Sequence, residues 1–170
     1  KNKKPEPDIT PVQAFNAHRQ ALGQRARILA MVIVPMEGDY TIPLRRAPDL
    51  KQACTEAWGP ANGEACMVSL RELLGVVGAH EWRKKGVEIT ALGDAPNNRI
   101  YPHYGVFSPV RGEYVDLVAN TPIKDKSLAF DIGVGTGVLS AVLAKRGVQH
   151  IVATDQDPRA LACARENLQR

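Results

Sequence analysis

The chain has 170 residues, of which 44% are hydrophobic, and a formal net charge of +4. This apolar content is enough for a packed core and excludes a chain that is disordered throughout, while the length allows one ordinary domain or two small ones. Acidic and basic residues are interspersed along the sequence, which lacks the strongly basic block of typical nucleic-acid-binding proteins.

The first predicted element is a long helix that begins at Thr10, after a Lys- and Pro-rich lead-in over residues 1–9 that we expect to be flexible. Thr10 can cap the helix, Pro11 suits its first position, and Gln13 can complete a capping box. Apolar residues at helical spacing predict the face that packs on the core, namely Phe15, Leu22, Ala26, Leu29 and Ile33.

Residues 31–44 have the pattern of a small β-hairpin. The end of the helical stretch, at 31–34, is β-branched enough to form a strand instead, and with a turn at 37–39 and a return at 40–44 a small hairpin is possible.

Two shorter helices are predicted after this hairpin. In the first, apolar residues recur every four positions until Gly59 and Pro60 stop the helix: Leu50, Cys54 and Trp58. The second has an apolar stripe made of Met67, Leu70, Leu74 and Val77. Its last turn is predicted at His80–Lys85, and Gly86 closes it. Residues 10–86 are therefore expected to form a mainly helical N-terminal domain.

Residues 87–107 predict a β-hairpin that links this domain to the next. Residues 87–92 alternate like a strand, residues 93–98 have turn chemistry, and residues 99–101 and 104–107 can return as the partner. Helices followed by a hairpin also describe a winged-helix domain. A DNA-binding module with a vestigial nucleotide fold therefore stays an alternative.

Residues 108–170 have a simpler pattern, which predicts a β-α-β-α unit of an α/β fold. A short apolar strand at 128–132 runs through a Gly-rich turn into a helix at 138–145, and a strand at 151–155 precedes a helix at 158–168. Such units place their strands parallel with a right-handed crossover. We therefore expect the first part of a Rossmann-like sheet.

The turn Asp131-Ile132-Gly133-Val134-Gly135-Thr136-Gly137 favours a nucleotide cofactor. Glycines allow positive φ and a close ligand, and Asp155 ends the second strand, where a ribose-binding carboxylate belongs. The NAD fingerprint G-x-G-x-x-G is incomplete, since Val138 occupies its third glycine position. Asp131 would repel a pyrophosphate but suits the ammonium group of S-adenosylmethionine. The residues thus favour S-adenosylmethionine, with an NAD-binding protein as the other alternative.

The stretch "FDIGVGTGVLSAVLAKRGVQHIVATDQDPRALACARENL" resembles the first two motifs of class I S-adenosylmethionine-dependent methyltransferases. Upstream, "YPHYGVFSPVRGEYVDLV" is similar to the entry segment of the release-factor glutamine (N5) methyltransferase type, in which a helical domain and a β-hairpin also precede the catalytic domain. The resemblance implies methyl transfer to a nitrogen of a protein glutamine or of a nucleic-acid base.

The same resemblance implies roles for particular residues. Gly133, Gly135 and Gly137 would line the methionine and ribose portions of the donor, and Asp131 would hold its amino group. Asp155 would bind the ribose hydroxyls, with Gln156 beside the adenine. One side of the pocket would be closed by Phe107, Ser108 and Arg111.

The family's acceptor-clamping motif, Asn/Asp-Pro-Pro-Tyr/Phe, does not occur in this sequence, so no catalytic residue is assigned. Together with the small number of strands, this leads us to expect the N-terminal portion of a longer, truncated enzyme that is inactive alone. Uncovered strands would favour self-association.

Cysteine usage and hydropathy complete the sequence-based expectations. Three cysteines without a CxxC pair indicate neither a disulfide framework nor a zinc site, and each is expected to be buried as a small apolar side chain. The N-terminus has no signal-peptide pattern, and the longest apolar stretch, residues 28–35, is too short to span a bilayer. We therefore expect a cytoplasmic protein without a membrane partner.

Overall fold

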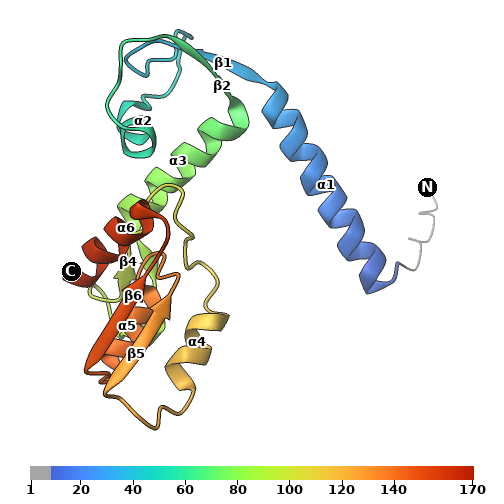
Figure 1. Cartoon of the computed structure of the whole chain (residues 1–170). Coiled ribbons are helices and arrows are strands. Elements are labelled where there is room, and N and C mark those ends of the chain that lie inside the picture. The colour runs from blue at the N-terminus through green and yellow to red at the C-terminus, as the bar shows by residue number, and fades with distance from the viewer. Residues whose placement is uncertain (1–8) are drawn as a thin grey trace.

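The computed structural model describes residues 9–170, so residues 1–8 of the predicted lead-in lie outside the described part. The described residues form a mixed α/β structure with three two-stranded sheets (Figure 1). Its elements, in chain order, are α1 (Pro11–Met31), β1 (Ile33–Met36), α2 (Lys51–Trp58), β2 (Cys66–Ser69), α3 (Leu70–Lys85), β3 (Val87–Glu88), a 3-10 turn (Thr90–Leu92), β4 (Arg99–Ile100), α4 (Glu113–Asn120), β5 (Leu128–Ile132), α5 (Val138–Lys145), β6 (His150–Thr154) and α6 (Pro158–Gln169).

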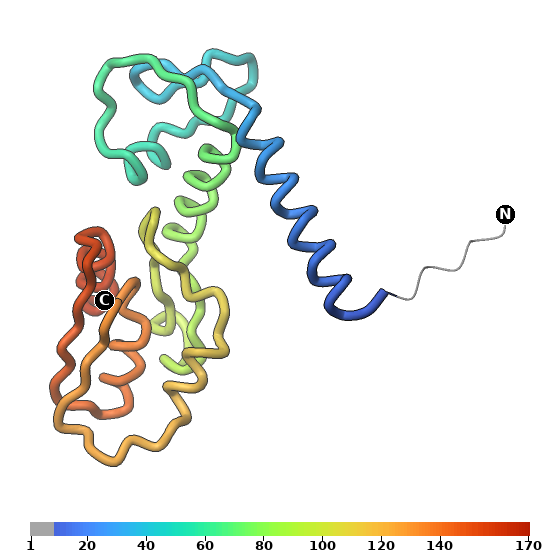
Figure 2. Tube along the Cα trace, turned by 45° about the vertical axis from the view of Figure 1, so that its right-hand side comes forward, coloured from blue at the N-terminus to red at the C-terminus, as the bar shows by residue number. Residues whose placement is uncertain are grey.

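Helix α1 begins as predicted and then departs from the expected packing. Thr10 accepts a hydrogen bond from the Gln13 N–H, and the Gln13 side chain bonds back to the Thr10 N–H, which completes the capping box. The helix has no buried residue, and Phe15 and Leu22 are 60% and 53% exposed. The prediction that this face packs on the core is wrong, because α1 projects away from the body and has its main contacts with α3 and β2 (Figures 1 and 2).

The first sheet has a longer connection than the predicted hairpin. Strand β1 pairs antiparallel with β2, from Ile33 opposite Ser69 to Met36 opposite Cys66, so the predicted return strand at 40–44 is wrong. Pro43 in that segment has no N–H to donate to a ladder. Met67, predicted on a helix, lies in β2, since Ser69 caps α3 by accepting the Glu72 N–H.

Two hydrophobic clusters hold the fold. In the first, α2 packs on α3 with Leu73 and Val76 as the buried face of α3, while the predicted Leu74 is 51% exposed. Its buried members are Met36, Leu50, Ala53, Cys54, Leu73 and Val76. Cys54 and Cys163 are buried as expected, but the prediction fails for Cys66, which is exposed at the end of the first sheet.

The second cluster joins the hairpin region to the C-terminal unit. The hairpin forms, but its ladder is only Val87–Glu88 against Arg99–Ile100, and residues 104–107 form no strand. Its apolar side chains turn inward onto α4 and α5. The buried members are Val87, Ile89, Ile100, Val115, Val138 and Val142. This shared core fixes the hairpin against the helix that follows the Gly-rich turn.

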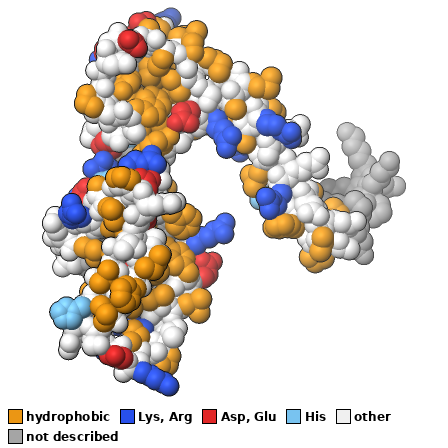
Figure 3. Space-filling model, viewed as in Figure 1, with side chains coloured by type: hydrophobic (Ala, Val, Ile, Leu, Met, Phe, Trp, Pro, Cys, Tyr) orange, Lys and Arg blue, Asp and Glu red, His pale blue; other side chains and the backbone are white. Residues whose placement is uncertain are grey.

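The predicted β-α-β-α unit is present, and its β5–β6 pair is parallel, with Phe130 opposite Val152 and Asp131 opposite Ala153. Large apolar side chains on one face of this pair of strands are exposed to solvent: Leu128, Phe130, Ile132 and Val152. Hydrophobic side chains gather on the surface over these strands in Figure 3. Within residues 9–170, β5 and β6 pair with each other and with no further strand. No helix in this range is long and apolar enough to cross a membrane.

Candidate cofactor site

The Gly-rich turn between β5 and α5 is fastened to the neighbouring strand. The N–H groups of Gly133 and Val134 both donate to the Thr154 carbonyl, at 2.8 and 2.9 Å. Gly133, Gly135 and Gly137 all have positive φ, at 81°, 53° and 83°. Because side chains with a Cβ rarely adopt this conformation, the sequence can form the turn only with glycines at low cost.

The glycines at the two ends of the turn have different surroundings. Beside Gly137, a Cβ atom would lie 3.2 Å from both Cα and Cβ of Ala164, so this glycine lets α6 approach the start of α5. Beside Gly133 a Cβ atom would meet nothing within 4 Å. Gly137 therefore serves helix packing, while Gly133 borders open space in which a ligand can lie.

Asp155, which follows β6, braces the middle of the turn. Its Oδ2 accepts the Gly135 N–H at 3.1 Å, and its Oδ1 accepts the Asp157 N–H at 2.9 Å. These hydrogen bonds, first from Asp157 and then from Gly135, lower the pKa of Asp155 below its ordinary value. The carboxylate is thus held ionised at the edge of the turn, and the Gly135 N–H is already engaged.

Asp131, near the end of β5, is the buried charge of the site. It is 8% exposed, and its Oδ2 accepts a hydrogen bond from Ser140 Oγ at 2.6 Å. Within the described chain this is the one hydrogen bond that its carboxylate makes. Because a carboxylate can accept several hydrogen bonds, Asp131 retains acceptor capacity for a ligand.

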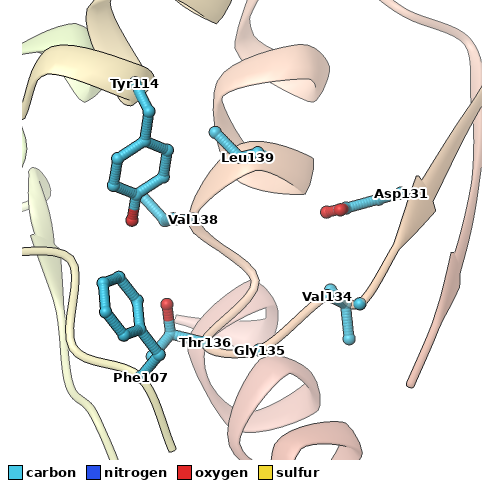
Figure 4. Close-up of a pocket in the computed structure, with 9 residues that line it drawn as sticks. Phe107, Tyr114, Asp131, Val134, Gly135, Thr136, Val138 and Leu139 are labelled. Atoms are coloured by element: carbon cyan, nitrogen blue, oxygen red, sulfur yellow. The ribbon is translucent and has the colours of Figure 1, made fainter. Parts of the chain in front are cut away.

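A cavity of about 210 Å³ opens beside the turn (Figure 4). Its lining residues are Phe107, Tyr114, Asp131, Gly133, Val134, Gly135, Thr136, Val138 and Leu139. Asp131 lies on one side, and the rings of Phe107 and Tyr114 lie on the other. Among the described residues, Asp131 is the only charged one in the lining, so the cavity favours a cationic group over an anionic one.

The structure brings together four of the predicted site residues at this cavity: Phe107, Asp131, Gly133 and Gly135. Gly137 and Asp155 contact the turn without lining the cavity. Gln156 and Arg111 are exposed outside it, and Arg111 makes no ion pair within the described range. Ser108 is beside Phe107 in sequence, and its hydroxyl oxygen is buried without a hydrogen-bond partner among residues 9–170.

Sequence reasoning missed three residues that shape the site. Tyr114 lines the cavity from the first turn of α4, and Ser140 holds Asp131. Asn167 of α6 is buried, and its side-chain N–H groups donate to the carbonyls of Thr136 and Tyr101 at 3.0 and 3.1 Å. Its Oδ1 accepts the Tyr101 N–H at 2.8 Å. Ser140 and Asn167 are polar residues on otherwise apolar helix faces. This pattern in the sequence could have identified them as residues that shape the site.

The cavity fits S-adenosylmethionine better than a dinucleotide. A cationic ammonium group finds the buried carboxylate of Asp131, and Gly133 leaves open space next to it. A pyrophosphate would meet the same carboxylate, and the Gly135 N–H that it needs is bonded to Asp155. The described residues thus form an α/β structure with a cavity beside the Gly-rich turn, and the charged side chain that lines this cavity is Asp131.

Comparisons with known proteins identify methyltransferases as similar to this C-terminal unit. Residues 116–170 match the family model for ribosomal protein L11 methyltransferase (PrmA), which covers less than half of the chain. A ribosomal protein L11 methyltransferase of Clostridium perfringens is 44% identical over 46 residues, which is 27% of this chain and 15% of that protein.

A second relative, from Methanocaldococcus jannaschii, is classed by name as a protein N5-glutamine methyltransferase. It is 37% identical over 65 residues, which is 38% of this chain and 32% of that protein. The matches thus span between about a seventh and a third of these relatives. They support an S-adenosylmethionine-dependent methyltransferase as the class, and the family model matches the part of the chain that contains the glycine turn.

Proposed function

We propose that this chain forms the donor-binding part of an S-adenosylmethionine-dependent methyltransferase. The observation that carries the proposal is the buried carboxylate of Asp131, the only charge in a cavity beside a three-glycine turn. Asp131 would bind the donor's ammonium group, and Gly133 and Gly135 would let its methionine and ribose portions come close to the backbone. Asp155, which also fixes the turn through the Gly135 N–H, would bind the ribose hydroxyls, and Gln156 would lie beside the adenine.

The donor supplies a methyl group that is electrophilic because it is bonded to a sulfonium. The chain's own contribution is to bind and orient this group, since much of the rate of a transfer comes from positioning. The proposed acceptor is a protein nitrogen, with a glutamine side chain as the first candidate, because the relatives are named for ribosomal protein L11 and for protein glutamine.

The proposed domain arrangement assigns residues 10–86 and the hairpin at 87–107 to acceptor recognition, and residues 108–170 to the donor. No Asn/Asp-Pro-Pro-aromatic run occurs in the sequence, so no residue is assigned to hold the acceptor nitrogen. We infer that this chain alone binds the donor without measurable methyl transfer, in a cytoplasmic setting.

A binding comparison tests the proposal. The 170-residue chain is titrated calorimetrically with S-adenosylhomocysteine and, separately, with NAD. Binding of S-adenosylhomocysteine with no binding of NAD supports it. Binding of NAD alone, or of neither ligand at millimolar concentration, contradicts it. Transfer of labelled methyl from S-adenosylmethionine to ribosomal protein L11 by this chain alone would overturn the inference that it is inactive.

A further inference from the structure

Phe107 and Tyr114 form an aromatic wall of the cavity, opposite Asp131 (Figure 4). Their ring centroids are 6.4 Å apart and their planes are inclined by 57°. Phe107 is 71% exposed and belongs to neither hydrophobic cluster, so core packing does not explain its position. An exposed aromatic ring that borders a cavity is available to a ligand.

The two walls of the cavity have the same electrostatic preference. The face of an aromatic ring carries the negative end of its quadrupole and attracts cations, and Asp131 carries a full negative charge. No Lys or Arg in residues 9–170 lines the cavity to offset either of them. The cavity is therefore suited to a ligand with two positive groups, one near the carboxylate and one near the rings.

We propose that Phe107 and Tyr114 recognise the sulfonium charge of the methyl donor, so that the site binds the donor in preference to its demethylated product. This inference rests on the proposed function and names what discriminates donor from product. S-adenosylmethionine has an ammonium and a sulfonium charge, whereas S-adenosylhomocysteine keeps only the ammonium. Asp131 contacts the group that both ligands share, and the aromatic wall contacts the charge that transfer removes.

The position of Tyr114 is fixed by its surroundings. It is half-buried in the first turn of α4, where it packs on the second cluster next to Val115. Burial raises the pKa of Tyr114, so the ring stays neutral at ordinary pH and acts through its face and not through a phenolate charge. Phe107, with its larger exposure, can adjust to the ligand.

Calorimetry on the full 170-residue chain tests the proposal with three ligands. These are S-adenosylmethionine, S-adenosylhomocysteine and sinefungin, in which a protonated amine replaces the methylsulfonium. Phe107→Leu and Tyr114→Leu are each expected to weaken S-adenosylmethionine and sinefungin by about 2- to 30-fold and S-adenosylhomocysteine by less than about 2-fold. Tyr114→Phe should retain the discrimination, because the ring face remains.

Phe15→Leu is the matched control, since Phe15 is a 60% exposed phenylalanine on α1, and it should change no affinity. Because Tyr114 also packs on the core, Phe107→Leu carries the test if Tyr114→Leu unfolds. An equal loss of affinity for all three ligands would mean that the two rings contact a portion that the ligands share, such as the adenine, and would overturn the proposal. Unchanged affinities for all three ligands would overturn it as well. If the unaltered chain binds none of the ligands, the proposed function itself fails.

Discussion

The hydroxyl of Ser140, in the first turn of α5, donates a 2.6 Å hydrogen bond to Oδ2 of Asp131 on β5, and both residues are buried. The bond joins the strand and the helix on either side of the Gly-rich turn. It therefore fixes the direction of the carboxylate that gives the cavity its charge.

Removing this hydroxyl should destabilise the protein. Ser140→Ala leaves a buried carboxylate without its donor, and we expect the free energy of unfolding to fall by about 1–3 kcal/mol. Urea denaturation followed by circular dichroism measures the change. Ser127→Ala, at an exposed position before β5, is the control and should cost far less. Equal decreases in the free energy of unfolding of the two variants would mean that the hydrogen bond from Ser140 to Asp131 does not stabilise the protein.

Neutralising Asp131 should affect ligand binding more than folding. Asp131→Asn keeps the size of the side chain and an acceptor for Ser140 but removes the charge. We expect S-adenosylhomocysteine to bind about 10- to 100-fold more weakly, as for the loss of a charged hydrogen bond. Asp125→Asn, in the loop before β5, is the control. An unchanged affinity of the Asp131→Asn variant would show that Asp131 does not bind the ammonium group of the ligand.

The close approach of α6 to Gly137 predicts a steric effect of any side chain there. Gly137→Ala combines a strained φ of 83° with a Cβ only 3.2 Å from two atoms of Ala164, and should cost about 2–4 kcal/mol. Gly63 has the same φ of 83° but open space, so Gly63→Ala should show the backbone cost alone. Chemical denaturation of both variants separates the two contributions. Similar values would show that α6 moves aside freely.

The hydrogen bonds to Asp155 predict a pH-dependent contribution to stability. Because its pKa is lower in the folded protein than in the unfolded chain, its stabilising effect is present above the unfolded value of 3.8 and is lost as the pH falls through the folded value. Asp155→Asn should therefore lower the melting temperature near neutral pH and match the unaltered protein at the acidic end. Asp94→Asn, in an exposed bend, is the control. A difference that is constant with pH would exclude ionisation as the cause.

The open apolar face of β5 and β6 predicts self-association of this chain. Phe130 and Ile132 are 63% and 76% exposed on neighbouring positions of one strand face. Light scattering after gel filtration should show oligomers that decrease in a Phe130→Ser, Ile132→Thr double variant. Phe15→Ser on α1 tests whether exposure anywhere on the surface has the same effect. Oligomers that persist in the double variant but disappear in Phe15→Ser would assign the association to α1.

Local sequence signals predicted local structure well. The residues of α5 and β5 were predicted with their observed limits, because a Gly-rich turn and short apolar runs define both. The capping box of α1 follows from Thr10, Pro11 and Gln13 alone. The distant pairing of β1 with β2 was not predictable, since the partner depends on how the intervening loop and α2 fold.

At the site, the sequence identified what the turn needs but not what surrounds it. Asp131, Gly133 and Gly135 were predicted from their spacing, and they do line the cavity. Tyr114 and Asn167 reach the site from α4 and α6, through tertiary packing that periodicity does not encode. The Arg111 and Gln156 roles came from the resemblance, and both side chains lie outside the cavity.

Helix α1 differs from the rest of the molecule in what keeps it ordered. It has no buried residue, and its main contacts with the rest of the molecule are with α3 and β2. Its first turns are therefore ordered by the Thr10–Gln13 capping box and by intrinsic helix propensity. Both act between residues that are only a few positions apart in the sequence. In hydrogen exchange these amides open by local fraying at a small fraction of the global unfolding free energy. Helix α1 thus unfolds separately from the rest of the protein. A partner that binds along α1 would be detected first as slower amide exchange in the N-terminal turns of this helix.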